Sequence, residues 1–548
     1  MGIADYMLIG VFLAGIFWLG SLFYKWVGEP DDFYVAGRKL TPFILAATLV
    51  ATNVNLYSFV GQSGVAYKNG ISIIWHTWTG NMAVVFSGLF VIPILRRLRI
   101  RTIPEFLGTR YNRSVRILVG FLWVLRLAFW LGVVLYTAVT AGQAITGIQS
   151  YTFWVLVFSL IVIIYTMVGG MWSIALTDVV QFILMMAGAL IALPLAMKAV
   201  GWWPGLVLRL PPAHLDLITK TGPYNWAFVI AIFFLGIQWA CTDQGLLQRA
   251  FSAESTKTVA KGLVMGGIIA TPFALLWIIP GLASGVLYPG LANADSAIPT
   301  LLVSLLPTGI LGLVVCGLLA SQMSTIDSNL GATATLFTND IYNRLLKREP
   351  TKKEILRVAR IATICVGIFM MGFSYLIPKL GGAVNAYLTV IGIMDMPLFI
   401  VAIVYGLLWK RSTWQGAIMG YFAGAIAGAI VKFGLGCGVP MATLASGGTA
   451  LLICPLVSVL TPKPDEGKIE KIFKAKVTSD EEIKRGEVYH IIPESLAGKI
   501  SLGVLGFGFV LFFVGTILGS QSLKISSLLA TVGMIIYFLG GFLRIHYE

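Results

Sequence analysis

The stretch Ala51-Thr52-Asn53-Val54-Asn55-Leu56-Tyr57-Ser58-Phe59-Val60-Gly61-Gln62-Ser63-Gly64 decides the fold. It lies within an apolar segment, residues 41–66, that is long enough to cross a membrane, which takes about 20 apolar residues. Asn, Ser and Gln stand here where a lipid-facing helix should carry Leu and Val. A broken helix explains them, because an unwound turn frees carbonyls that can bind a cation and is tolerated only beside a cavity. Tight helix packing is the alternative, and it explains the glycines better than the amides.

The composition of the whole chain points to the same environment. Of its 548 residues, 57% are hydrophobic and 11% are charged, with a mean hydropathy of +0.87. So few charged groups cannot cover the surface of a soluble domain, so the solvent must be lipid. Enzyme chemistry is not expected, because no HExxH or P-loop motif is present and the histidines are dispersed at His76, His214, His490 and His546. Five scattered cysteines without a CxxC pair predict buried thiols rather than a disulfide framework or a metal site.

The hydrophobic pattern predicts an all-α polytopic membrane protein of about 15 transmembrane helices. The first segment has no basic start and no cleavage site, so it is expected to be retained as a span. The expected spans are residues 5–26, 41–66, 70–95, 117–147, 151–169, 173–199, 224–247, 258–288, 305–340, 356–377, 384–409, 414–433, 440–461, 499–518 and 525–543.

The net charge of +15 comes from basic residues that gather in loops on one side of these spans. One loop holds Arg96 to Arg116 and another holds Arg344 to Arg357, with Lys463–Arg485 on the same side. The positive-inside rule then predicts a multi-pass protein of the cell (inner) membrane with its N-terminus outside and its C-terminus cytoplasmic. This bias accounts for the charge without a nucleic-acid partner. The sequence leaves the oligomeric state open, and a monomer is compatible with it.

Two further polar stretches lie at membrane depth, where polar groups are functional candidates. Gln238–Gln244 comes five spans after the first break, at an equivalent place in a second half, which favours an inverted repeat. Asp243 and Gln244 could instead end a helix at the interface. Ser321–Asn329 places hydroxyls of Ser321, Ser324, Thr325 and Ser328 on one helical face with Asp327 at its edge. Such oxygens suit an alkali cation, although hydroxyls also bond back to the i−4 carbonyl.

Three ionisable residues stand alone in apolar segments: Asp178, Arg126 and Asp395. Arg126 is expected near the midplane, where its guanidinium could hold a substrate carboxylate in a bidentate contact. It could equally pair with Asp395, which is expected at a similar depth. The sequence does not decide between these two interpretations.

Residues 1 to about 460 resemble the sodium:solute symporter family, which includes sodium/glucose, sodium/proline and sodium/sialic-acid cotransporters. The resemblance is carried by Ala51–Gly64 with Ala66–Gly70, Thr177-Asp178, Cys241–Gln244 with Gln248-Arg249, Met323–Tyr342, and Trp409–Arg411. It implies the five-plus-five inverted-repeat fold of the leucine-transporter type. The expected parts are an extra helix and loop (1–40), a core (41–409, with repeats 41–199 and 224–409), two more helices (410–462), a cytoplasmic loop (463–497) and two C-terminal helices (498–548).

The resemblance also implies where sodium binds. The common site of the family corresponds to the carbonyls of Ala51 and Val54 with Ser321, Ser324 and Thr325. A second site, present in some members, is similar to Asp178 with Ser324, Asp327 and Ser328, where Asp327 replaces a hydroxyl. The expected cargo ions are therefore one or two Na⁺, with no other metal.

The substrate positions depart from the sugar-transporting members. Positions that bind sugar there are Ser58, Thr77, Ala270 and Thr389 here, so a typical sugar is not favoured. Arg126 favours an anionic solute such as a carboxylate or acidic sugar. The function expected is sodium-coupled symport of a small solute by alternating access; the alternatives are a neutral sugar or amino acid as cargo, or an uncoupled uniporter or channel. The candidate lining residues are Asn53, Asn55, Tyr57, Ser58, Gln62, Thr77, Trp78, Arg126, Trp130, Trp239 and Thr389.

Overall fold

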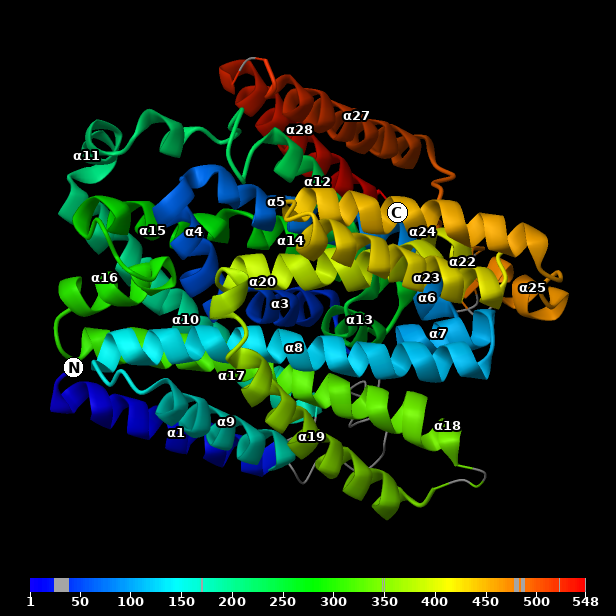
Figure 1. The fold of residues 1–548 in the computed structure, drawn as a ribbon, viewed down its shortest axis with the longest axis horizontal. Coiled ribbons are helices and arrows are strands. Elements are labelled where there is room, and N and C mark those ends of the chain that lie inside the picture. Colours follow the sequence, from blue (N-terminus) through cyan, green and yellow to red (C-terminus); the bar gives the residue numbers. More distant parts are fainter. Residues whose placement is uncertain are drawn as a thin grey trace.

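The computed structural model describes residues 1–23, 39–168, 171–346, 348, 350–477, 482–483, 488–521 and 523–547. Within these ranges the regular structure is helical, and only two isolated β-bridges accompany it. The long helices lie side by side across the molecule, with α11 and α16 toward one end and α7, α18 and α25 toward the other (Figure 1). The prediction of an all-helical chain is confirmed.

The helices fall into groups that follow the chain. The first half contains α1 (Ile3–Phe23), α3 (Pro42–Asn53), α4 (Ser63–Asn69), α5 (Ile74–Phe86), α6 (Ile92–Arg97), α7 (Ile103–Arg110), α8 (Arg113–Thr146), α9 (Tyr151–Val168), α10 (Met171–Val200) and α11 (Trp202–Arg209). The second half contains α12 (Trp226–Thr242), α13 (Gln244–Phe251), α14 (Thr256–Ala270), α15 (Leu275–Leu287), α16 (Ala297–Leu305), α17 (Ile310–Leu336), α18 (Asn343–Leu345), α19 (Lys352–Ser374), α20 (Ala383–Val390), α21 (Met396–Phe399) and α22 (Tyr405–Leu408). The carboxyl-terminal part contains α23 (Trp414–Ala429), α24 (Val439–Leu460), α25 (Glu466–Lys474), α27 (Leu496–Leu518) and α28 (Leu523–His546).

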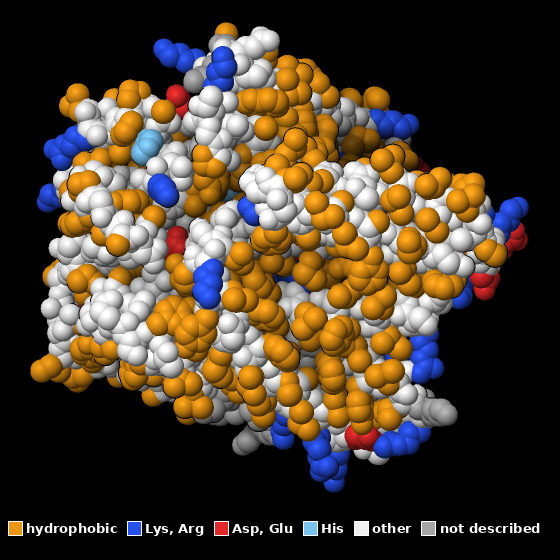
Figure 2. Space-filling model, in the orientation of Figure 1, with side chains coloured by type: hydrophobic (Ala, Val, Ile, Leu, Met, Phe, Trp, Pro, Cys, Tyr) orange, Lys and Arg blue, Asp and Glu red, His pale blue; other side chains and the backbone are white. Residues whose placement is uncertain are grey.

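Among the described residues, 11 helices are long and apolar enough to cross a membrane, or 12 if the bent pair α12 and α13 counts as one span. Within the described residues, α1, α3 and α9 contain only shorter apolar stretches, which are Ile3–Gly15, Pro42–Ala51 and Tyr151–Ile163. The count of about 15 therefore stays a prediction. Hydrophobic side chains cover much of the outer surface over α8, α19, α23 and α24 (Figure 2). Residues such as Leu452 and Phe433 are more than half exposed there, as expected of a surface that faces lipid.

The predicted break in residues 41–66 is confirmed. α3 ends at Asn53, and Val54 is extended, with φ −93° and ψ 103°. The chain resumes as a π-helix, η3 (Tyr57–Gln62), and then as α4. Asn53 and Asn55 flank the extended residue, and their short amide side chains favour turns over helix. The broken segment packs against α10, α13, α14 and α17, so it lies inside the bundle.

A second break separates α12 from α13, which are bent by 47°. Asp243 lies at the bend, where its Oδ1 accepts a hydrogen bond of 3.1 Å from the Leu246 amide and caps α13. Asp243 and Gln244 are both buried. The chain continues as a buried helix beyond these two residues, which supports a broken span, and their interpretation as an interfacial helix end stays an alternative.

Candidate functional site

The first break meets α17 at a hydroxyl. Ser321 Oγ donates a hydrogen bond of 3.3 Å to the carbonyl oxygen of Val54, the extended residue between α3 and η3. Ala51, Val54, Ser321, Ser324 and Thr325 are each at most 4% exposed. The structure therefore brings two of the five residues expected around sodium into direct contact and encloses all of them between α3 and α17.

The hydroxyls on this face of α17 also bond within their own helix. Thr325 Oγ1 lies 3.0 Å from the Ser321 carbonyl, and Ser328 Oγ lies 2.8 Å from that of Ser324. Both geometries follow the i−4 pattern that sequence reasoning raised as the alternative. A hydroxyl that donates to a carbonyl keeps its lone pairs for a cation. The described residues contain no cluster of three or more His, Cys, Asp or Glu side chains suited to a transition metal.

The residues expected around a second sodium ion have a different neighbourhood. Ser328 Oγ accepts a hydrogen bond of 2.7 Å from Nη2 of Arg249, whose Nη1 donates to the Gly245 carbonyl at 3.0 Å. Asp327 is 1% exposed. The side chain of Asp178 lies outside the described residues. Ser328 therefore already accepts a hydrogen bond from a guanidinium, whose positive charge lies beside this set.

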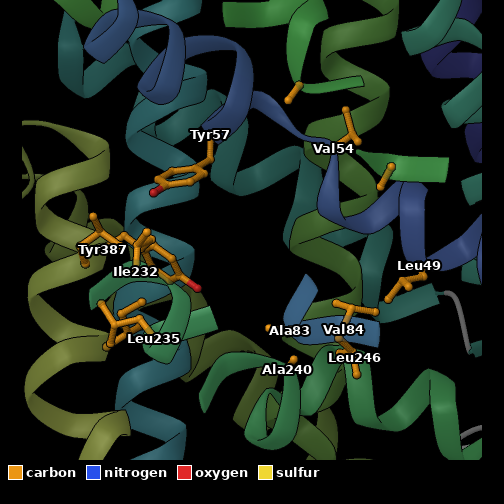
Figure 3. Close-up of a cluster of buried hydrophobic side chains, with 14 of the residues drawn as sticks. Leu49, Val54, Tyr57, Ala83, Val84, Ile232, Leu235, Ala240, Leu246 and Tyr387 are labelled. Atoms are coloured by element: carbon orange, nitrogen blue, oxygen red, sulfur yellow. The ribbon is translucent and has the colours of Figure 1, made fainter. Parts of the chain in front are cut away.

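A cavity with about 980 Å³ of empty space, part of it open to solvent, lies beside the two breaks. Its walls come from α3, η3, α5, α8, α12, α13, α17 and α20. Figure 3 shows Tyr57 near Tyr387 and Ile232 on one side, and Leu49 near Leu246 on the other. Thr325 also lines it, so the expected ion ligands and the cavity adjoin. Eight of the predicted lining residues are in its wall: Asn53, Asn55, Tyr57, Ser58, Gln62, Thr77, Trp130 and Trp239.

Three predicted lining residues are not in this wall. Trp78 donates its indole N–H to the Thr271 carbonyl at 3.1 Å, and Thr389 donates to the Asn385 carbonyl at 2.7 Å. The third, Arg126, is 2% exposed and lies behind the wall. Trp78 and Arg126 are engaged by groups far away in the sequence, whereas Thr389 bonds back to the i−4 carbonyl of its own helix.

Arg126 pairs with two carboxylates. Its Nε lies 2.8 Å from Oδ2 of Asp395, and its Nη1 lies 3.4 Å from Oδ2 of Asp243. The guanidinium also lies over the Trp123 ring, 5.5 Å from its centroid. The structure thus shows Arg126 paired with Asp395, which is one of the two interpretations that the sequence left open.

Sequence reasoning missed several groups in the wall. His76, Gly80 and Asn81 share one face of α5 with Thr77, and their spacings of three to five residues are a helical signal that a search for a polar face would have found. Asn329 follows Thr325 by one turn on α17. The full set of additional lining residues is Leu49, His76, Gly80, Asn81, Ile232, Leu235, Gly236, Asp243, Gly245, Leu246, Arg249, Asn329, Tyr387 and Ile391.

Two hydrogen bonds orient the amide of Gln62. Its Oε1 accepts from the Thr77 hydroxyl at 2.8 Å and from the Trp277 indole N–H at 3.1 Å. An amide oxygen that receives two donors is fixed, which directs the amide nitrogen to the other side. Nearby, the Tyr57 hydroxyl and His76 Nε2 lie 3.3 Å apart. The wall thus offers donors and acceptors of fixed direction.

Aromatic rings close the cavity at one side. The ring of Tyr387 lies 4.5 Å from that of Trp130 and 5.3 Å from that of Tyr57, centroid to centroid. Tyr57 and Trp130 are 5.4 Å apart in an edge-to-face arrangement. Such packing leaves no path between the three rings. The aromatic cluster therefore separates the cavity from the bundle end at which α20 begins.

Asp295 connects the elements at that end. It precedes α16, and its Oδ2 accepts hydrogen bonds from the Tyr136 hydroxyl at 3.1 Å and from the Ala383 amide at 3.2 Å, so it caps α20. Burial raises the pKa of Asp295 to about 6. The hydrogen bonds from the Ala383 amide and the Tyr136 hydroxyl act on this pKa in the opposite direction. At the other end of the span that begins with α20, the Nε of Arg110 donates a hydrogen bond of 3.0 Å to the Gly406 carbonyl of α22.

Two broken helices beside a buried polar cavity, within a bundle of apolar helices, define a multi-pass membrane transporter. The family model described as "Sodium:solute symporter family" matches residues 33–424. The chain belongs to the sodium:solute symporter family, so it is a sodium-coupled solute symporter and not an enzyme.

Relatives and solved structures agree with this assignment. The chain is 27% identical to a sodium/glucose cotransporter of Vibrio parahaemolyticus, over 78% of this chain and 85% of that protein. It is 25% identical to the sodium/sialic acid symporter SiaT of Proteus mirabilis, over 79% and 90%. In structure it is similar to a substrate-bound, outward-open Na⁺-coupled sialic acid symporter, with a TM-score of 0.76 at 22% identity over 85% of this chain and 99% of that one. It also resembles Mhp1, a nucleobase-cation-symport-1 family transporter, with a TM-score of 0.56 at 15% identity over 82% and 99%.

Proposed function

We propose that the protein binds Na⁺ between the carbonyls of Ala51 and Val54 and the hydroxyls of Ser321, Ser324 and Thr325, and carries it with a small solute held in the cavity. The observation that carries this proposal is the contact of 3.3 Å between the Ser321 hydroxyl and the Val54 carbonyl. A cation there would join the broken α3–η3 segment to α17. Because Thr325 belongs to both the ion ligands and the cavity wall, ion and solute would stabilise each other's binding.

The proposed arrangement is a core of residues 41–409 built from two inverted repeats, 41–199 and 224–409, with the basic loops in the cytoplasm. The breaks at Val54 and Asp243 support it, since each comes early in its repeat. In this orientation Asp295 lies at the outer end. The cavity reaches α13, whose Gln244 donates to the Arg101 carbonyl in a basic loop at 2.9 Å, so it extends toward the cytoplasmic side. Alternating access would then require the contacts at Asp295 to open.

The proposed solute is small, uncharged and rich in hydroxyl groups. Carboxamides and hydroxyls of fixed direction line the cavity, and aromatic rings close it on one side. Such a wall suits a ligand with a polar rim and an apolar face. The preference for an anion rested on Arg126, whose charge is instead balanced by Asp395 and Asp243. Without that support, a neutral cargo, which the sequence offered only as the alternative, becomes the first candidate.

One observation favours an anionic solute as the second candidate. Arg249 lines the cavity and is 4% exposed, so a carboxylate could approach its guanidinium. Arg249 also donates to Ser328, so a carboxylate bound to its guanidinium would adjoin the second set of expected ligands. The two candidates differ in the charge that moves in each cycle.

Reconstituted vesicles test the proposal. A solute is first found by the rise it causes in the thermal unfolding midpoint with and without Na⁺, since a ligand of the native state stabilises it. Uptake of labelled solute and labelled Na⁺ then gives their ratio. One Na⁺ with a neutral solute moves one charge, so an inside-negative potential of 100 mV contributes about 2.3 kcal/mol, roughly a fiftyfold gradient. If one Na⁺ enters with each solute molecule and uptake does not depend on the membrane potential, the anionic solute is favoured. Accumulation of solute without Na⁺ would contradict symport.

A further inference from the structure

A second hollow lies at the basic end of the bundle and shares no lining residue with the transport cavity. It lies where α7, the first turns of α8 and α18 meet, and it has about 680 Å³ of empty space. Three of its lining side chains are guanidinium groups. We call it the arginine hollow, and it is lined by Gly108, Thr109, Arg113, Arg116, Asn343, Arg344 and Leu346.

The charges around the arginine hollow are unevenly balanced. Arg116 lies 2.7 Å from Asp340 and 3.7 Å from Glu105, so both nearby carboxylates serve this one arginine. Arg113 and Arg344 form no ion pair with a described residue, and both are exposed. Arg113 and Arg116 act on Arg344 as like charges, and Glu105 and Asp340 act on it as opposite charges, so three guanidiniums face two carboxylates around the hollow. An anion between these guanidiniums would relieve their repulsion.

Other groups around the hollow favour the same ligand. Arg113 is the first residue of α8, a helix of 34 residues whose amino-terminal end carries the positive end of its dipole. Asn343 has a side-chain oxygen that is buried without a hydrogen-bond partner among the described residues. Turning that amide presents its N–H₂ group as a donor. The hollow thus combines guanidiniums, a helix end and an amide, the groups that bind phosphate oxygens.

We propose that the arginine hollow binds the phosphate group of an anionic membrane lipid. α8 and the helix that runs from α17 to α18 have 34 and 36 residues, more than the roughly 20 that cross the apolar core, so both helices extend through the layer of lipid headgroups. Leu346 lines the hollow, and the neighbouring Leu345 is 63% exposed, which gives an acyl chain an apolar surface beside the phosphate site. A free phosphate ion would use the same guanidiniums without needing this surface. The proposal concerns a surface away from the cavity and does not depend on the identity of the solute.

The test uses the full-length protein, purified and freed of lipid in a neutral detergent. Phosphatidylglycerol, phosphatidylcholine or inorganic phosphate is titrated in, and both the thermal unfolding midpoint and lipid retained in native mass spectrometry are measured. Each surface arginine contributes about 1 kcal/mol toward an anionic headgroup, or roughly fivefold in affinity. The double variant Arg113→Gln/Arg344→Gln should therefore bind phosphatidylglycerol about 25-fold more weakly.

Arg348→Gln is the matched control. Arg348 is an exposed arginine of the same end, but its Nη1 already pairs with Glu354 at 2.9 Å, so this variant should bind phosphatidylglycerol like the parent. Arg113→Lys/Arg344→Lys keeps the charges and should retain most of the binding, which separates a binding defect from misfolding. Equal binding of phosphatidylglycerol by the Gln variant, or equal effects of phosphatidylcholine, would overturn the proposal. If inorganic phosphate alone has the same effect as phosphatidylglycerol, the ligand is a free anion rather than a lipid, and the proposal is overturned.

Discussion

Asp295→Ala should loosen the end of the bundle at which α20 begins. The carboxylate is 7% exposed and accepts hydrogen bonds from the Tyr136 hydroxyl and the Ala383 amide. In the closed state of the variant, the Ala383 amide would be buried without a hydrogen-bond partner, which costs about 1–3 kcal/mol. In an open state water would hydrate the same amide, so the open state does not bear this cost. The Tyr136 hydroxyl would also lose its acceptor, although it would keep the hydrogen bond of 3.4 Å that it accepts from the Asn293 amide. The fraction of open molecules should rise about 5- to 100-fold.

A buried reporter cysteine measures that fraction. Val384 of α20 is 2% exposed and packs against Gly61 of η3 so closely that a Cβ added to Gly61 would lie 3.3 Å from the Val384 side chain. A cysteine introduced by Val384→Cys should therefore react only when α20 and η3 separate. The accessible Cys365 and Cys437 are first replaced by Ser. The rate of reaction with a membrane-impermeant maleimide should increase in proportion to the open fraction.

The control for this experiment is Asp216→Ala. Asp216 is a partly buried carboxylate in the loop before α12 that makes no ion pair with a described residue. Labelling in this variant should match the parent. If Asp295→Ala changes the rate by less than twofold while the folded protein is retained, the closing role of the carboxylate is refuted.

Three further predictions concern the charges and the ion. Because burial raises the pKa of Asp295 from 3.8 to about 6, the closed arrangement binds a proton more tightly than the hydrated one, so acid favours closure. The rate of maleimide labelling of the reporter cysteine, divided at each pH by the rate for the unfolded chain, should fall about fourfold from about pH 7.5 to about pH 5.5. An increase would contradict this. Thr325→Ala removes one proposed ligand and should raise the Na⁺ concentration for half-maximal uptake about tenfold, whereas Thr335→Ala on the same helix should not; equal values for both would argue against the proposed site. Asp395→Asn leaves only Asp243, 3.4 Å away, to balance the buried Arg126 charge and should destabilise the protein by about 3–5 kcal/mol, much of which Arg126→Met in the same chain should restore; an unchanged unfolding midpoint would show that the pair contributes little.

Local sequence was sufficient for the helices and their first break. Spans follow from the length of apolar runs, because a helix satisfies its backbone hydrogen bonds within one segment and lipid selects apolar side chains. The break at Val54 was also predictable, since Asn53 and Asn55 are local signals. The bend at Asp243 was harder to interpret, because the same residues would suit a helix end at the interface, and only their burial favours a broken span.

The composition of the cavity wall depended on packing. The Trp78 indole faces the Thr271 carbonyl rather than the cavity, and the rotation of its helix about its axis decides this. His76 and Asn81 became lining residues because α5 packs against α12 with this face toward the cavity. A span surrounded by apolar residues carries only a weak pattern of faces, so its rotation cannot be read from the sequence.

The sequence by itself determined a membrane-spanning helical bundle, a broken second span and a set of hydroxyls on one face of a later helix. These are properties of single segments, which backbone hydrogen bonding and local side chains control. Only the tertiary structure decided that Arg126 pairs with Asp395, 269 positions away, and it brought the Ser321 hydroxyl to the Val54 carbonyl, a meeting that the family resemblance had implied. Such pairings depend on which helices pack together and at what rotation, and that is set by the fit of whole surfaces across the bundle.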